Sequence, residues 1–178
     1  MFRIVDPDTL APLPTGEDGL ILLGGSQIMK GYLNNPAKTA EAVIERDGLR
    51  WYKTGDKGHL DADGFLTVVD RYSRFAKIGG EMISLTAVEA ALRQALGYDE
   101  QPLAAVAVPD AKKGERLLLL VEEAAEPVGA RLRKADILPL YRPAQVLQVD
   151  RIPILGSGKT DLTAVRRLAL ELVDADGA

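Results

Sequence analysis

The sequence predicts an α+β chain made of two lobes, a small and mostly β N-terminal lobe and an α+β C-terminal lobe with a small sheet and helices. In residues 1–69, short apolar runs alternate with glycine, proline and aspartate turns, which is typical of strands joined by hairpins. After a charged joint at 70–74, longer apolar runs alternate with apolar stripes at helical spacing. We therefore expect lobes at 1–69 and 75–178, with residues 70–74 as a hinge.

The composition is that of a globular protein with a mildly acidic charge. The chain of 178 residues has 22 basic and 26 acidic residues, a net charge of −4, which gives no support for nucleic acid as a partner. It has no cysteine, which excludes thiol catalysis and disulfides, and its single histidine, His59, cannot form a histidine-based metal site. The first ten residues do not show the basic region and apolar core of a signal peptide, so none is expected, and no apolar run in the sequence reaches transmembrane length. We expect a cytoplasmic chain without a metal site of its own.

The first lobe is expected to consist of hairpins and one helix. Pro36 can open a helix at Ala37–Ile44, because its missing N–H is not needed in the first helical turn. The pairs Asp47-Gly48 and Asp63-Gly64 are typical of hairpin turns. The expected strands are Phe2–Val5, Leu20–Leu23, Leu49–Lys53, Gly58–Leu60 and Phe65–Val69.

The second lobe is expected to begin with a hairpin around Gly79-Gly80, followed by a helix at Leu85–Leu96 that ends at Gly97. The cap of this helix is either Thr86, in a capping box, or Ser84. The other expected elements are hairpin strands Phe75–Ile78 and Glu81–Ile83, buried strands Leu103–Val108 and Leu117–Val121, a helix at Ala130–Leu138, a strand at Gln145–Val149, and a last helix capped by Thr160-Asp161 with Leu162, Val165, Leu168 and Leu172 on one stripe. Residues 174–178 are expected to fray.

Two polar motifs before and at the joint have candidate binding roles. In Thr54-Gly55-Asp56 a carboxylate follows a glycine turn, and its two oxygens can accept hydrogen bonds from the two hydroxyls of a ribose. Arg71, beside Asp70 at the end of a strand, can bind a ribose or phosphate oxygen. Taken alone, each motif favours a structural role, as a turn-stabilising aspartate or as a surface ion pair that contributes little to stability.

Two glycine-rich motifs after the joint also suggest chemistry. Gly79-Gly80 permits positive φ and a close approach of the backbone, so a thin substrate arm could pass it, although a plain hairpin is the alternative. Lys159 ends a Gly-Ser-Gly run, but it is not a nucleotide phosphate loop, because Pro153 stands where the first glycine of that motif is required. A lysine on such a mobile loop could instead stabilise charge that develops on carboxylate and phosphate oxygens in a transition state.

Together and in this order, the motifs resemble the C-terminal part of the adenylate-forming (AMP-binding) superfamily, which includes acyl-CoA synthetases, luciferases and nonribosomal peptide adenylation domains. The wording is most similar to the acyl-acyl carrier protein synthetase half of bifunctional 2-acylglycerophosphoethanolamine acyltransferase/synthetases. The matches extend along nearly the whole chain. They are Gly31-Tyr32, Pro36, Thr39, residues 52–56, Gly64-Phe65, Asp70-Arg71, residues 77–83, Glu89, Pro143, Pro153 and Gly158-Lys159.

The resemblance implies a two-step ligase. In this family a carboxylate reacts with ATP to give an acyl-adenylate and pyrophosphate, the small lobe then rotates, and a thiol takes the acyl group as a thioester. It implies that residues 1–69 are the end of the large AMP-binding domain and 75–178 its C-terminal lid. The implied residues are Lys159 as the catalytic lysine of adenylation, Thr54, Asp56, Arg71, Lys77, Gly79 and Gly80 as cofactor-binding residues, and Asp70 and Ser73 as the hinge.

The implied cofactor is ATP with Mg²⁺, and the implied partners are a fatty acid, an acyl carrier protein or coenzyme A, and an upstream adenylation core. Two positions depart from the family: Ser73 replaces the usual hinge Asp or Lys, and Leu162 replaces an arginine found in many relatives. The sequence also lacks the family's phosphate loop and its aromatic-Gly-x-Thr-Glu segment. We therefore expect a C-terminal part or split partner that is inactive alone; the alternative is a free-standing module that docks a carrier protein or a separate core without catalysis.

Overall fold

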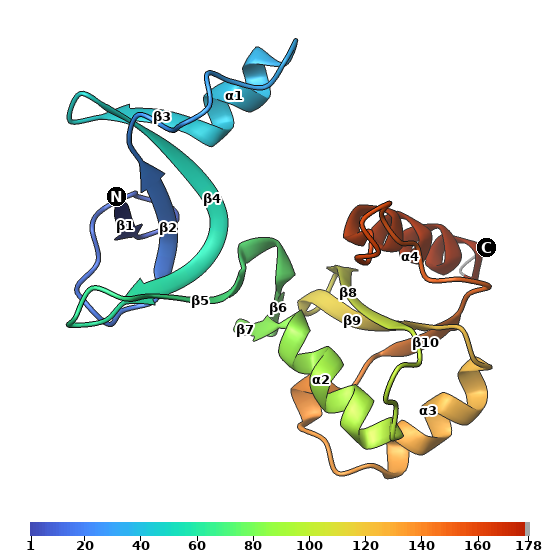
Figure 1. Ribbon diagram of the computed structural model, residues 1–178. Helices are drawn as coiled ribbons and strands as arrows, with labels where there is room; N and C mark the ends of the chain where they lie inside the picture. Colours follow the sequence, from blue (N-terminus) through green and yellow to red (C-terminus); the bar gives the residue numbers. More distant parts are fainter. Residues whose placement is uncertain (177–178) are drawn as a thin grey trace. The chain divides into compact units, whose positions relative to one another are not determined.

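The computed structural model describes residues 1–176, and its chain divides into two compact units. Unit 1 is Met1–Ser73 and unit 2 begins at Arg74, so the boundary falls between two residues of the expected hinge. Each unit has its own five-stranded sheet, and helices occur in both (Figure 1). The predicted α+β class is confirmed.

Unit 1 is built around one long strand. The sheet has the order β1-β2-β4-β3, and β5 pairs with the second half of β4. Figure 1 shows β4 as a curved strand that runs the length of this unit. Its small core consists of Val5, Leu20, Leu22 and the fully buried Trp51. The elements are β1 (Phe2–Val5), β2 (Gly19–Gly24), α1 (Pro36–Ala42), β3 (Val43–Arg46), β4 (Leu49–Leu60) and β5 (Leu66–Arg71).

Strand β4 corrects the expectation of two short strands separated by a turn at Thr54-Gly55-Asp56. On β2, Leu22 pairs with Lys53 but Leu20 pairs with Lys57, so the three intervening residues of β4 form a bulge. Gly55 adopts φ +77°, which a glycine can do inside a continuous strand. The bulge bends the strand and changes the direction of its side chains without ending it.

Helix α1 is shorter than expected. It begins at Pro36, and the Asn35 side chain accepts the Lys38 main-chain N–H as its cap. It ends at Ala42 rather than at residue 44, because the β-branched Val43 and Ile44 pair with β4 instead.

We expect Gly58→Ala to destabilise unit 1. A Cβ at this position would lie 2.1 Å from the Thr67 carbonyl oxygen, a backbone atom that cannot move without disturbing the β4–β5 pairing. The free energy of unfolding should fall by about 1–3 kcal/mol, as for other overpacked sites. Urea unfolding followed by the fluorescence of Trp51, the single tryptophan, reports on this unit. The control is Gly156→Ala in unit 2, where a Cβ would meet open space, and both variants are also unfolded under circular dichroism, which reports on both units. An equal loss in the control would contradict the prediction.

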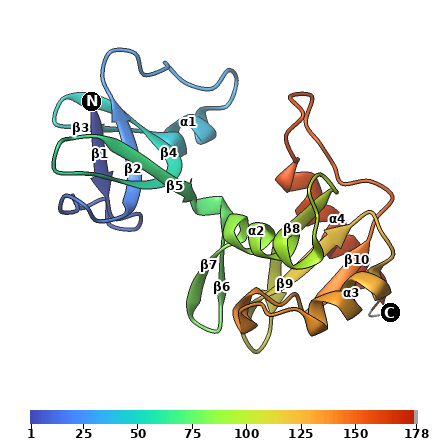
Figure 2. The same cartoon turned by 60° about the horizontal axis from the view of Figure 1, so that its bottom comes forward.

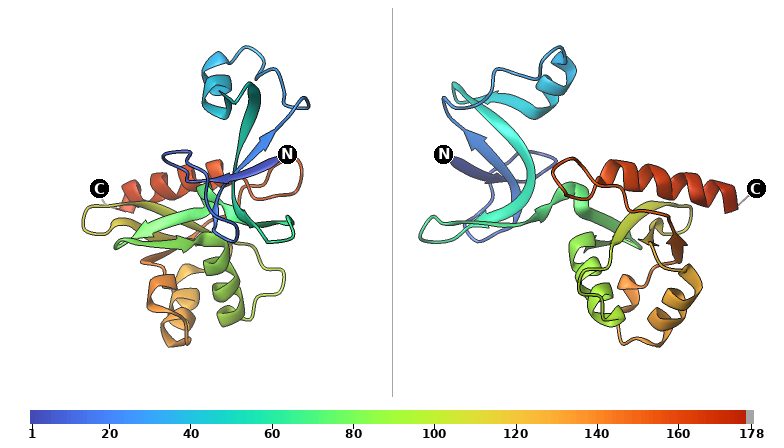
Figure 3. Two further views of the ribbon diagram at one scale, coloured as in Figure 1. Left: turned by 90° about the vertical axis from the view of Figure 1, so that its left-hand side faces the viewer. Right: turned by 45° about the vertical axis from the view of Figure 1, so that its right-hand side comes forward.

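Unit 2 is a three-layer arrangement with a mostly antiparallel sheet. Its sheet has the order β10-β9-β6-β7, β8 lies beside β9, and the β9–β10 pair is parallel. Along β9, Leu117, Leu119 and Val121 pack in one core cluster with residues of α2 and α3, whereas Leu118 and Leu120 pack in another with residues of α4. Figures 2 and 3 show α4 on the opposite face of the sheet from α2 and α3. The elements are β6 (Phe75–Ile78), β7 (Glu81–Ser84), α2 (Leu85–Leu96), β8 (Leu103–Asp110), β9 (Gly114–Val121), α3 (Ala125–Lys134), β10 (Gln145–Gln148) and α4 (Leu162–Asp176).

The structure decides between the two caps considered for α2, and three other details of unit 2 differ from the expectations. Ser84, not Thr86, caps α2, since its Oγ accepts the Ala87 N–H at 3.1 Å. Helix α3 covers 125–134 rather than 130–138, and Pro139 begins a separate 3₁₀ turn. Leu162 is 37% exposed and lies outside the buried stripe of α4. Residues 174–176, which were expected to fray, are the last helical residues of α4, and residues 177–178 of the same expectation lie outside the described residues.

Candidate functional site

The carboxylate of Asp56 and the guanidinium of Arg71 meet on neighbouring strands of unit 1. The two residues are direct partners in the β4–β5 register, and Arg71 Nε lies 2.8 Å from Asp56 Oδ1. The Arg71 side chain is 66% exposed and that of Asp56 26%. So exposed an ion pair contributes little to stability. Ligand oxygens can therefore replace or extend it at small energetic cost, which suits a binding site for ribose hydroxyls.

Thr54 shapes the bulge that presents Asp56. Its Oγ1 donates a hydrogen bond to the Ile21 carbonyl on β2, at 2.8 Å, and accepts the main-chain N–H of Asp56, at 3.0 Å. The hydroxyl thus fixes Asp56 to the neighbouring strand. In this structure Thr54 therefore positions the Asp56 carboxylate through hydrogen bonds to the main chain.

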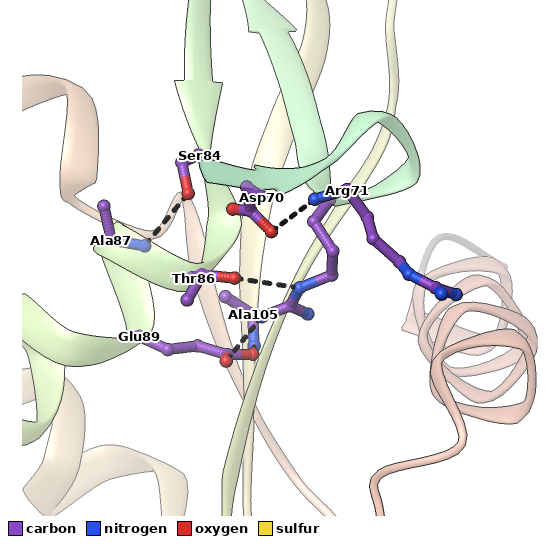
Figure 4. A network of polar contacts seen from close by, with 8 residues as sticks. Asp70, Arg71, Ser84, Thr86, Ala87, Glu89 and Ala105 are labelled. Carbon is purple, nitrogen blue, oxygen red and sulfur yellow. Dashed lines mark hydrogen bonds and ion pairs between the residues drawn. The ribbon is translucent and has the colours of Figure 1, made fainter. Parts of the chain in front are cut away.

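Each side of the expected hinge is held within its own unit. On the unit 1 side, the Asp70 carboxylate accepts the Arg71 main-chain N–H at 2.7 Å (Figure 4). On the unit 2 side, Arg74 forms an ion pair with Glu89 of α2, at 2.6 Å. Ser73, between these contacts, is exposed and lies in a single 3₁₀ turn, Tyr72–Arg74.

The Gly79-Gly80 turn joins β6 and β7 at one corner of unit 2. Both glycines have positive φ, +61° and +92°, and a Cβ at either would meet open space. The turn rests on the loop before β9, because the Gly79 N–H donates to the Lys113 carbonyl at 2.9 Å and the Lys77 N–H donates to Glu115 Oε2 at 2.6 Å. The corner is thus open for the approach of a ligand yet fixed by hydrogen bonds.

Lys159 lies on a closed loop rather than on a free arm. Leu155 N–H donates to the Lys159 carbonyl at 2.7 Å, and Gly158 N–H donates to the Leu155 carbonyl at 2.9 Å. Residues 154 and 160 form an antiparallel bridge at the base of the loop. The lysine therefore lies on the returning side of a small hairpin, not at its tip. Its side chain is exposed, so the ammonium group is available to a ligand.

The structure brings the candidates together in three groups. Thr54, Asp56 and Arg71 form one group in unit 1, Lys77 lies beside Gly79-Gly80 in unit 2, and Lys159 lies on its own loop of unit 2. Sequence reasoning did not find the contacts made by Arg74 and Glu115, which join residues 15 and 38 positions apart. Such distant pairs follow from how strands and helices pack, and no local spacing marks them.

The chain is similar to parts of longer ligases. Acyl-CoA ligase sidI of Aspergillus fumigatus is 33% identical over 176 residues, which cover 91% of this chain and 30% of the relative. Phenyloxazoline synthase MbtB of a Mycobacterium species is 34% identical, with 92% of this chain and 14% of the relative covered. For 4-coumarate–CoA ligase 1 of Arabidopsis thaliana the identity is 37%, with 89% and 28% covered. The homologues of the present chain are AMP-binding ligases. The chain spans about a third or less of the length of these relatives.

Solved structures agree with this relationship. ATP-bound MatB from Rhodopseudomonas palustris superposes with a TM-score of 0.72 at 25% identity, covering 97% of this chain and 34% of that protein. The O-succinylbenzoate coenzyme A synthetase MenE of Bacillus subtilis, in complex with AMP, gives 0.64 at 26% identity, covering 92% and 32%. No family model matches the chain. Within the described residues, no helix has both the length and the apolar character needed to cross a membrane.

Proposed function

We propose that this chain is the C-terminal part of an ATP-dependent ligase that activates a fatty acid as its adenylate and transfers the acyl group to a phosphopantetheine thiol. The observation that supports it most directly is the Asp56–Arg71 pair, an exposed carboxylate and guanidinium on adjacent strands, in a chain whose homologues are AMP-binding ligases. We use "complete ligase" for this chain together with an upstream adenylation core.

In the first half-reaction a carboxylate oxygen attacks the α-phosphorus of ATP, and the bond to pyrophosphate breaks. Asp56 would hold the ribose hydroxyls, with its Oδ1 also held by Arg71. The exposed ammonium of Lys159 would stabilise the negative charge on the reacting oxygens. Mg²⁺ would be held by ATP and by residues of the core, since the described residues include no cluster of three candidate ligands.

In the second half-reaction the thiol sulfur attacks the acyl carbon of the adenylate, AMP leaves, and the thiol proton goes to solvent. The open Gly79-Gly80 corner would admit the pantetheine arm. Lys112 and Lys113 are exposed on the loop against which this turn rests, so two cations lie at the same corner. These charges suit an acceptor that bears phosphate, as both an acyl carrier protein and coenzyme A do. Of these two acceptors we favour the acyl carrier protein, because the motifs of this sequence are most similar to those of acyl-acyl carrier protein synthetases. The location that we propose is the cytoplasm.

The test is complementation. The chain and a separately expressed upstream core are mixed and assayed for fatty-acid-dependent exchange of pyrophosphate into ATP. Exchange by the mixture but by neither part alone would support the proposal. Exchange by this chain alone would contradict it. A folded pair that shows no exchange but binds an acyl carrier protein would favour the docking module, which the ligase homologues do not favour.

We expect Asp56→Asn to weaken ATP binding in the complete ligase. The substitution removes the charge that strengthens hydrogen bonds to the ribose, a loss of about 1.5–3 kcal/mol, or roughly 10- to 100-fold in KM for ATP. Steady-state kinetics with ATP varied measures it, and KM for the fatty acid should change little. Asp63→Asn, with the same charge change on an exposed turn of unit 1, is the control. An unchanged KM for ATP would exclude the ribose-binding role.

A further inference from the structure

We propose that Arg74 is a positioning residue that confines rotation between the two units to Ser73. The observation is a cluster at the first residue of unit 2, which we call the Arg74 clamp: Arg74, Thr86, Glu89 and Ala105. The existence of the clamp is independent of the proposed function. Only its consequence for catalysis rests on that function.

The clamp joins the start of unit 2 to two elements of its core. Arg74 donates from one guanidinium nitrogen to Glu89 Oε2 at 2.6 Å, and from Nε to Thr86 Oγ1 at 3.3 Å. The other Glu89 oxygen, Oε1, accepts the main-chain N–H of Ala105 on β8, at 2.9 Å (Figure 4). Glu89 is therefore a bridge between Arg74, helix α2 and a central strand.

Burial distinguishes this ion pair from those on the surface. The side chains of Arg74 and Glu89 are 11% and 20% exposed, whereas both partners of the Arg167–Glu171 pair on α4 are more than half exposed. Removing one partner of a poorly solvated pair leaves the other charge without compensation. The clamp should therefore hold Arg74 rigidly against unit 2, which an exposed pair would not do.

The other side of Ser73 is anchored as well. The Tyr72 side chain packs against the core of unit 1, formed by Val5, Leu20, Leu22 and Trp51, and burial raises the pKa of its hydroxyl. Arg71 is held to Asp56 by the β4–β5 pairing. Ser73 is thus the one residue between an anchor in unit 1 and an anchor in unit 2, and it is exposed. A change of its φ and ψ angles would turn the units as whole bodies.

The first experiment uses this chain and needs no ligase activity. Backbone ¹⁵N relaxation should give heteronuclear NOE values for residues 74–76 that equal the mean of unit 2 in the wild type. In Arg74→Ala these values should fall below that mean, while those of α4 stay unchanged. Glu89→Gln, which keeps an acceptor for the Ala105 N–H but loses the charge, should cause a smaller fall at the same residues. Arg74→Lys keeps the charge and should restore most of the rigidity.

The control is Arg93→Ala, which removes another arginine near the far end of α2, bonded to the Gln101 carbonyl. It should leave residues 74–76 unchanged. Wild-type mobility at 74–76, or a rigid segment in Arg74→Ala, would overturn the proposal.

In the complete ligase, Arg74→Ala should slow both half-reactions by the same factor without changing KM for ATP, and Arg74→Lys should recover both. Slowing of only one half-reaction would overturn the positioning role. Absence of all ligase activity in the wild type would count against the proposed function and leave the relaxation result intact.

Discussion

Lys159→Ala in the complete ligase should lower the rate of acyl-adenylate formation by about 10²–10³, the loss typical when one well-placed charge that stabilises a transition state is removed. The fold should be unaffected, because the Lys159 side chain is exposed and the loop is held by main-chain hydrogen bonds. Thioester formation from pre-made acyl-adenylate should stay at the wild-type rate, because no bond to pyrophosphate breaks in that step. The two half-reactions are measured separately, by pyrophosphate release and by thioester formation.

The matched control for this substitution is Lys134→Ala, which removes an exposed lysine from the end of α3 in the same unit. Both rates should stay within a factor of two of the wild type, roughly the effect of a surface substitution. A loss of both half-reactions in Lys159→Ala, or of neither, would contradict the role assigned to Lys159. A loss that Lys159→Arg restores fully would indicate that charge alone, rather than the position of the ammonium, is required.

The sequence was most informative where one local signal dominates. Helix α2 has its bounds at Leu85 and Leu96 as predicted, because an apolar stripe lies between two strong termini, and Gly97 ends it in the left-handed conformation with φ +63°. The central strands were found from continuous apolar runs, since a strand buried on both faces needs no alternation. The hairpin around Gly79-Gly80 was found because two glycines separate two apolar runs.

Prediction failed where pairing with distant residues decides the local structure. The sequence predicts a turn at the bulge of β4, because Gly55 interrupts the strand pattern, and only the register with β2 shows that the strand continues. Val43 and Ile44 fit a helix locally but are drawn into β3 by pairing with Trp51 and Tyr52. Helix α3 contains Pro127 and Gly129, both poor in a helix interior, so its first half gave no helical signal.

The candidate site shows the same division. Its motifs could be found because each combines a turn with a charged residue, as at Asp56 and Lys159. The contacts that position them could not, because Arg74, just before β6, and Glu89 of α2 come together only when α2 packs on the sheet. Motif order therefore suggested what chemistry the chain takes part in. It did not show that Thr54 is tied to β2 or that the loop of Lys159 is closed.

In the complete ligase, Gly80→Leu should slow the half-reaction that Lys159→Ala leaves unchanged. The side chain would project into the open corner through which the pantetheine arm is proposed to pass. Thioester formation from pre-made acyl-adenylate should fall by about 10² or more, the cost of displacing a reacting group by roughly 1 Å. Adenylation should keep its wild-type rate, because the proposal assigns this corner to the pantetheine arm, which takes part only in the second half-reaction. Pyrophosphate release and thioester formation measure the two effects.

Strain must be separated from obstruction in this variant, because Gly80 has φ +92° and any other residue would be strained there by about 1–2 kcal/mol. Gly97→Leu provides the same strain without the obstruction, since Gly97 has φ +63°, also faces open space, and ends α2 away from the hairpin turn. If strain alone mattered, both variants would lose stability and activity alike. A selective loss of thioester formation in Gly80→Leu would assign the corner to the acceptor thiol. Together with a selective loss of adenylation in Lys159→Ala, it would mean that unit 2 presents a different surface in each half-reaction, as a rotation about Ser73 requires.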